Sequence, residues 1–189
     1  MAAQLLVSTI LITACAAPPN REIGDAEQAL KSARAAGAER YAPESYQAAA
    51  EAYRLANEAV TTSDYRLALN RALESREHSQ TATREAAEAR AQARDAAMQT
   101  MTEVKSLLAR VTDAADAAER ARAPRGVVRD VRQALTLVET DVQKAGAAIE
   151  AEDYDEADAR LAMTKARLEA AMADLETGMK PQRSKRPRR

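Results

Sequence analysis

The sequence contains few of the residue types that build large cores or catalytic centres. Among its 189 residues there is no Phe, no Trp, one His and one Cys. A single cysteine excludes an intrachain disulfide, and one His with one Cys is too few for a zinc site. The five glycines are scattered, so the chain has no glycine-rich phosphate-binding loop. We therefore predict neither an enzyme nor a bound cofactor or metal.

Alanine dominates the remaining composition. The chain has 47 alanines, and 30% of its residues are charged. Alanine, Glu, Arg and Leu are strong helix formers, whereas the β-branched and aromatic residues that strands prefer are scarce. We therefore predict an all-α fold, an elongated antiparallel helical bundle or coiled coil with a thin core.

Helix breakers divide this composition into about five helices. Ala42-Pro43 separates the first helix from the second, TTSD at 61–64 separates the second from the third, and Ala123-Pro124 begins the fourth. The third helix is very long, because no Pro or Gly interrupts it, and Asp64 is its expected N-cap. The expected helices cover about residues 21–40, 43–61, 64–123, 124–150 and 154–178.

Apolar residues in these helices recur at alternating spacings of three and four, as in coiled coils. The fourth and fifth helices have the most regular seams, with predicted core positions Val128, Val131, Leu135, Val138, Val142, Ala145, Ile149, Tyr154, Ala157, Leu161, Thr164, Leu168, Ala171 and Leu175. Residues 79–97 of the third helix have no apolar side chain larger than alanine. This stretch either packs as a close alanine seam or lies in solvent.

A short motif occurs twice, at the expected starts of the third and fifth helices. The pattern DYxxAxxR begins at Asp64 and again at Asp153, an offset of 89 residues. We infer two antiparallel helical modules that share the long third helix. The motif is similar to helix openings of tetratricopeptide repeats, but the expected helices are too long and too few for their period of about 34 residues.

An apolar segment near the start of the chain ends at Ala14, far short of the ~20 residues that a membrane-spanning helix requires. Its length and position are typical of a signal peptide. The residues Ile12-Thr13-Ala14-Cys15 resemble the bacterial lipobox. That resemblance implies attachment of a diacylglycerol to the thiol of Cys15, cleavage before Cys15 and acylation of its new amino group. Because Ala16 and not Asp follows, it also implies sorting to the outer membrane.

Two prolines follow this segment closely. Pro18 and Pro19 prevent a continuous helix and are expected to begin a flexible tether. The alternative to a lipidated Cys15 is a free cysteine at the start of an apolar helix.

The stretch YAPESYQAAAEAYRLANEAVTTSDYRLALNRALESREHSQTA, with the helix before it, resembles a bacterial lipoprotein domain of unknown function. The resemblance covers about residues 22–90 and rests on the alanine-rich composition, the AP helix start and the tyrosine that opens the next helix. Such domains often precede an OmpA-like peptidoglycan-binding domain, whereas this sequence continues with more helix. The resemblance implies a fold and a location, and no activity.

Charge is unevenly distributed along the chain. Residues 16–179 carry 22 Lys or Arg and 29 Asp or Glu, whereas the last ten residues carry six positive charges and no negative one. We expect this basic tail to be disordered and to contact an anionic partner through Lys180, Arg183, Lys185, Arg186, Arg188 and Arg189. In the envelope that partner would be lipopolysaccharide phosphate, an acidic wall polymer or an acidic protein, and nucleic acid is less favoured. The alternative is a tail that only solubilises the chain end.

The aromatic residues are five tyrosines, Tyr41, Tyr46, Tyr53, Tyr65 and Tyr154. The simpler interpretation is that they fill the core with their hydroxyls at its rim, and the alternative is a partner-binding patch. His78 lies in the polar run ESREHSQ, where we expect a solvated side chain.

Together these observations predict a non-catalytic, lipid-anchored envelope protein that faces the periplasm. It would act as a scaffold, spacer or adaptor through helical packing with a protein partner or a second copy. One alternative is a soluble coiled-coil module that binds nucleic acid or another polyanion through the basic tail. Another is a periplasmic chaperone-like bundle with a cleft between its first three helices. The predicted segments are a signal peptide (1–14), a lipidated tether (15–21), an N-terminal helical module (22–97), a C-terminal helical-bundle module (98–179) and the basic tail (180–189).

Overall fold

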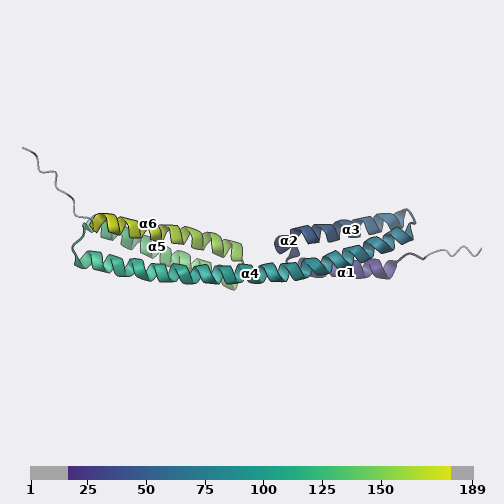
Figure 1. Ribbon diagram of the computed structural model, residues 1–189, viewed down its shortest axis with the longest axis horizontal. Helices are drawn as coiled ribbons and strands as arrows, with labels where there is room; N and C mark the ends of the chain where they lie inside the picture. Colours follow the sequence, from purple (N-terminus) through teal and green to yellow (C-terminus); the bar gives the residue numbers. More distant parts are fainter. Residues whose placement is uncertain (1–16, 180–189) are drawn as a thin grey trace, which may run out of the picture. The chain divides into compact units, whose positions relative to one another are not determined.

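The computed structural model of the protein describes residues 17–179, and every regular element in that range is a helix (Figure 1). This confirms the predicted all-α fold. The long helix α4 confirms the expected uninterrupted third helix. The elements are α1 (Asn20–Ala35), α2 (Ala38–Tyr41), α3 (Pro43–Thr61), α4 (Tyr65–Arg120), α5 (Arg125–Glu150) and α6 (Tyr154–Met179).

The segment expected as one helix over 21–40 is two helices, α1 and α2, separated at Gly37. Gly37 has a φ of 83°, in the left-handed region that glycine enters without a steric penalty. Its N–H donates to the carbonyl of Arg34 at 2.9 Å, which closes the end of α1. An isolated glycine inside a helical pattern does not reveal the sign of its φ, so the sequence alone did not show this break.

The three turns that join the longer helices contain no glycine at the left-handed position and share one backbone conformation. In each, a residue with positive φ follows the helix, and the next N–H bonds to a carbonyl five residues back, at 2.9 to 3.0 Å. The left-handed residues are Ser63, Arg122 and Glu152. After the first of these turns, the Asp64 carboxylate accepts a hydrogen bond from the N–H of Leu67 at 3.0 Å. Asp64 is therefore the N-cap of α4, as the sequence predicted.

The chain forms two compact units, divided between Ala89 and Arg90. The first contains α1, α2, α3 and the beginning of α4, and the second contains the rest of α4 with α5 and α6. The sequence-based division lies slightly later, after residue 97. Both copies of the DYxxAxxR motif do open helices, α4 in one case and α6 in the other.

The core of the first unit consists mainly of alanines. α1, α3 and α4 each contribute fully buried alanines, such as Ala26, Ala56 and Ala72. Because alanine is small, the helices meet closely enough for a buried Ser75 hydroxyl on α4 to donate to the carbonyl of Ala49 on α3, at 2.9 Å. The largest side chain in this core is Tyr46, which is buried among alanines of α1, α2 and α4.

The core of the second unit contains larger aliphatic side chains. α4, α5 and α6 bury one continuous cluster that includes Val104, Val138 and Leu168. All seven positions predicted for the last seam, from Tyr154 to Leu175, are buried on α6. On α5 the predicted positions are buried or half-buried. The alternating three-and-four spacing therefore located this core correctly.

Residues 79–97 of α4, which have no apolar side chain larger than alanine, show both arrangements that the sequence left open. One part packs as a close alanine seam, and the other lies in solvent. Ser79, Ala82 and Ala86 are fully buried in the first unit, so the beginning of the stretch packs as a close seam. From residue 87 to residue 96 no side chain is buried. The second unit's core begins at Ala97 and Met101.

Replacing Leu168 by alanine should destabilise the second unit by about 2–5 kcal/mol, because a fully buried leucine leaves a cavity when it is truncated. The matched control is Met163→Ala on the same helix, where the side chain is 60% exposed and its loss should change stability little. Urea denaturation followed by far-ultraviolet circular dichroism measures both. Equal stabilities for the two variants would contradict this account of the core.

Candidate functional site

An arginine-lined hollow lies where α4 ends and α5 begins. α4 ends at Arg120, a four-residue turn follows, and α5 starts at Arg125. The hollow has a volume of about 950 Å³ and is open to solvent. We call it the arginine groove, and its lining residues are Glu119, Arg122, Ala123, Arg125, Val128, Arg129 and Arg132.

The four arginines line one groove because of their spacing. Arg125, Arg129 and Arg132 are separated by four and three residues, so they share one face of α5. Arg122 joins them from the preceding turn, where its left-handed φ of 54° lets the chain reverse direction. This spacing of three, four and three is visible in the sequence, but it does not by itself predict a binding site. Charged residues on a helix are usually a solvated face, so the pattern alone was weak evidence.

Two of these arginines are held by carboxylates. Arg129 donates to the adjacent Asp130 at 2.9 Å. Arg132 donates to Asp116 and, at 3.2 Å, to Glu119, both on α4, so it links the two helices. These hydrogen bonds, with the one to Asp116 contributing most, raise the pKa of the Arg132 guanidinium above its usual value. Arg132 therefore acts first as a structural contact between α4 and α5.

The other two arginines are available to a ligand. Arg122 and Arg125 are exposed, and neither side chain makes an ion pair or hydrogen bond within the part of the chain that the structure describes. The first turn of α5 contains no acidic residue that would neutralise them. Residues 119–132 carry five arginines and two acidic residues, although residues 16–179 as a whole carry a net charge of −7. The groove is thus a cationic patch on an acidic body.

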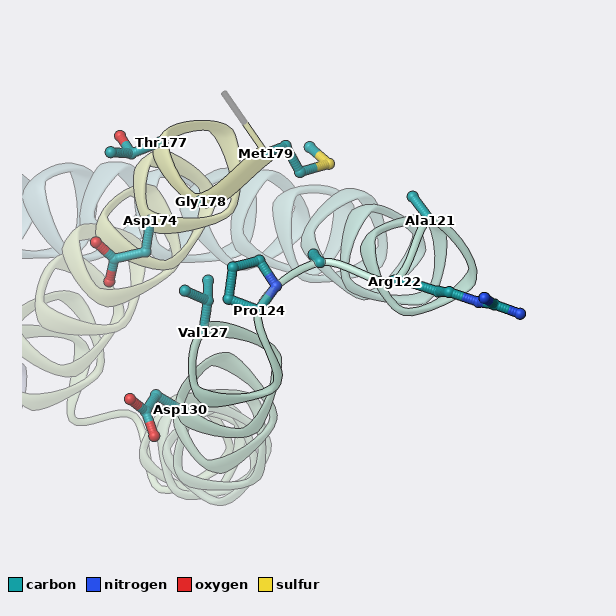
Figure 2. Close-up of a pocket in the computed structure, with 10 residues that line it drawn as sticks. Ala121, Arg122, Pro124, Val127, Asp130, Asp174, Thr177, Gly178 and Met179 are labelled. Carbon is teal, nitrogen blue, oxygen red and sulfur yellow. The ribbon is translucent and has the colours of Figure 1, made fainter. Parts of the chain in front are cut away.

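A second open hollow, of about 1180 Å³, adjoins this turn on the side of α6 (Figure 2). Pro124 of the turn and Val127 of α5 lie at its centre with Met179 above them. Arg122 lies at its edge, and its side chain extends away from Pro124. Asp130 and Asp174 lie on its far side from Arg122. We call the exposed apolar groups beside this hollow the apex, defined as Ala121 and Pro124 of the turn and Met179 at the end of α6.

Gly178 allows α6 to approach α5 closely at this end. A Cβ atom added to Gly178 would lie 3.1 Å from both γ-carbons of Val127, which is tighter than ordinary van der Waals contact. The close approach places Met179 beside the turn. The basic segment 180–189 continues directly from Met179 in the sequence, so it is attached to the chain next to the arginine groove.

The residues that the sequence singled out for function lie outside the described range. Cys15 and the six cations from Lys180 to Arg189 belong to residues 1–16 and 180–189, so the lipidation and tail predictions stay predictions. His78 is half-buried on α4, with its imidazole 3.9 Å from the Glu74 carboxylate.

The tyrosines mainly fill the core and its edges. Tyr46 and Tyr154 are buried, and the other three are half-buried. The Tyr46 hydroxyl accepts a hydrogen bond from Arg34 at 2.9 Å, and this bond with the neighbouring Glu39 raises the pKa of the Arg34 guanidinium. A shallow hollow of about 500 Å³ on the first unit is lined by residues of α1 and α4, and no tyrosine lines it.

Residues 17–179 contain neither a candidate metal-binding cluster nor a candidate membrane-spanning helix. No cluster of three or more His, Cys, Asp or Glu side chains there could hold a metal ion. No helix in that range combines the length and apolarity that crossing a bilayer requires.

Comparison with known proteins identifies one similarity. Residues 21–98 match a family described as Domain of unknown function (DUF4398). The match covers α1, α2, α3 and α4 as far as residue 98, so the arginine groove lies outside it. No curated protein and no solved structure matches the chain significantly.

Substituting Gly178 by alanine should destabilise the second unit by about 1 kcal/mol, because the new methyl group would press against Val127. The matched control is Gly146→Ala inside α5, where the added Cβ would meet only the end of Met101, at 4.0 Å. There alanine should stabilise the helix by about 0.5–1 kcal/mol. Thermal melts of both variants test the close approach, and stabilisation of the same size by Gly178→Ala would show that it is absent.

Proposed function

We propose that this protein is a non-catalytic, lipid-anchored envelope protein that acts as a periplasmic scaffold, spacer or adaptor. The observation that carries the proposal is α4, a single helix of 56 residues that supplies buried positions to two separate cores. One helix that belongs to two bundles links two sets of surfaces within one chain. Such an architecture suits a protein that connects other components.

The surfaces of both units support a role in packing and contact. Ion pairs between residues three or four apart cover exposed helix faces, for example Arg54 with Glu51 and Glu58 on α3. These pairs keep the outer faces hydrated and contribute little to stability. Single large apolar residues such as Leu137 and Met163 are exposed among them, at 55% and 60%. Helical faces of this kind can bind a second helix, whether from a partner protein or another copy.

The envelope location rests on the N-terminal sequence. Ile12-Thr13-Ala14-Cys15 supports lipidation of Cys15, and Ala16 supports outer-membrane sorting. Three acyl chains on one cysteine exceed the two membrane signals that stable anchoring needs. The match of residues 21–98 to a domain of unknown function is compatible with this location and supplies no activity.

The arginine groove favours a second candidate function, the binding of a polyanion. The sequence suggested this role for the basic tail alone. Arg122 and Arg125 now add two exposed guanidinium groups at the same end of the second unit.

Metabolic labelling with a clickable palmitate analogue tests the anchor. Wild-type protein should be labelled and should fractionate with outer-membrane markers until detergent releases it. Cys15→Ala should remove the label, because Cys15 is the only thiol in the chain.

The control for this experiment is Ala16→Asp. In lipoproteins of this type an aspartate after the cysteine favours retention in the inner membrane, so this variant should keep its label and change membrane. An unlabelled wild type, or equal labelling of wild type and Cys15→Ala, would refute the proposed anchor.

A further inference from the structure

We propose that the arginine groove and the adjoining apex form a binding site for the phosphate headgroups of an anionic lipid surface. This site goes beyond the proposed scaffold function, since it does not depend on lipidation of Cys15. It would give the chain a second membrane contact.

Two guanidinium groups of the groove are free to bind a phosphate group. Arg122 and Arg125 are exposed and make no side-chain ion pair or hydrogen bond among residues 17–179. A guanidinium presents its donors in a planar fork that fits two oxygens of a phosphate group. Arg129 and Arg132 line the same groove, but their charges are offset by carboxylate partners, so they hold the groove's shape and leave the free positive charge to Arg122 and Arg125.

The apolar apex lies beside these arginines and offers a surface that can enter a lipid headgroup layer. Ala121 and Pro124 are exposed in the turn, and Met179 is 45% exposed at the end of α6. In water these groups are simply solvated, as single exposed apolar residues and cations usually are. At a lipid surface the apolar atoms can enter the headgroup layer while the guanidinium groups pair with phosphates.

The residues that line the two hollows favour a lipid surface over a nucleic acid. Proteins that bind single strands usually stack bases on aromatic side chains, and no aromatic residue lines either hollow at this end. Asp130 and Asp174 face the hollow on the α6 side, where they would repel a phosphate backbone that wrapped around the turn. A contact confined to the apex and the groove fits a surface of separate headgroups better than a continuous strand.

The basic segment 180–189 would strengthen the same contact. It carries six positive charges and begins one residue after Met179, which belongs to the apex. Each Lys or Arg held near an anionic leaflet strengthens binding about fivefold, and the effect decreases as salt screens the charges. Phosphatidylglycerol and lipid A both present the required phosphate groups, and the experiment must separate these two sources.

The test is sedimentation of residues 15–189, the chain without the predicted signal peptide, with vesicles at low ionic strength. The protein carries Cys15→Ser, so no acyl chain contributes to binding. Three vesicle types are compared: phosphatidylcholine alone, phosphatidylcholine with phosphatidylglycerol, and phosphatidylcholine with lipid A. We expect salt-sensitive binding to one or both of the anionic types and none to phosphatidylcholine. A preference between the two anionic types identifies the headgroup.

The decisive variant is Arg122→Gln/Arg125→Gln, which should weaken binding to anionic vesicles about 25-fold if each arginine contributes about fivefold. Its matched control is Arg66→Gln/Arg110→Gln, which removes the same charge from two exposed arginines of α4 that also lack described ion pairs. The control should stay within about twofold of the parent, because neither of its arginines lines the groove. Unchanged thermal melts would show that both variants are folded.

Several outcomes would overturn the proposal. Equal weakening in the two double variants would mean that net charge alone drives binding. Loss of binding on deleting 180–189, with no effect of Arg122→Gln/Arg125→Gln, would assign the whole contact to the tail. Tighter binding of a short DNA strand than of any vesicle, lost in the same double variant, would make the groove a nucleic-acid site. Failure of palmitate labelling would leave this experiment unaffected, because it uses unacylated protein.

Discussion

The structure depends on the burial of one narrow apolar seam per helix. A chain without Phe or Trp cannot fill a wide core, so each helix must present small or aliphatic side chains at alternating spacings of three and four. In the first unit this seam is mainly alanine, and close helix contact replaces side-chain volume. In the second unit Val and Leu enlarge it. Where neither unit supplies partners, at residues 87–96, α4 has no buried side chain.

Periodicity predicted the parts of the fold that repeat and missed the parts that depend on single residues or on distant ones. The buried face of α6 was predicted correctly because seven positions at this spacing all indicate the same face of the helix. The break at Gly37 was missed because a left-handed φ leaves no periodic signal. The alanine stretch of α4 was ambiguous because alanine suits both a close seam and a solvated helix. The arginine groove was missed because charged residues on a helix usually form a solvated face. Only the fold shows that Arg132 is paired by carboxylates of another helix, whereas Arg122 and Arg125 have no partner among residues 17–179.

The functional features lie at different places in the chain and use different chemistry. The proposed anchor is covalent and hydrophobic, and Cys15 alone determines it. The arginine groove is electrostatic, and it combines the end of α4, a turn and one face of α5. The apex adds the end of α6 beside it. Between them, α4 contributes to both cores, so neither unit can form without part of this helix. In the proposed function, the shared helix α4 connects the surfaces that would bind partners.

The most direct test of this account is hydrogen exchange along α4. If seam burial holds the helix, amides in residues 87–96 should exchange much faster than those in 68–86 and 101–118, where buried or half-buried seam positions recur every three or four residues. If alanine's helix propensity alone held α4, protection would be similar along the whole helix, since alanine is abundant throughout. Exchange measured by mass spectrometry with peptide resolution distinguishes the two. Fast exchange at 87–96 between two protected segments is the predicted result, and uniform protection would contradict the account.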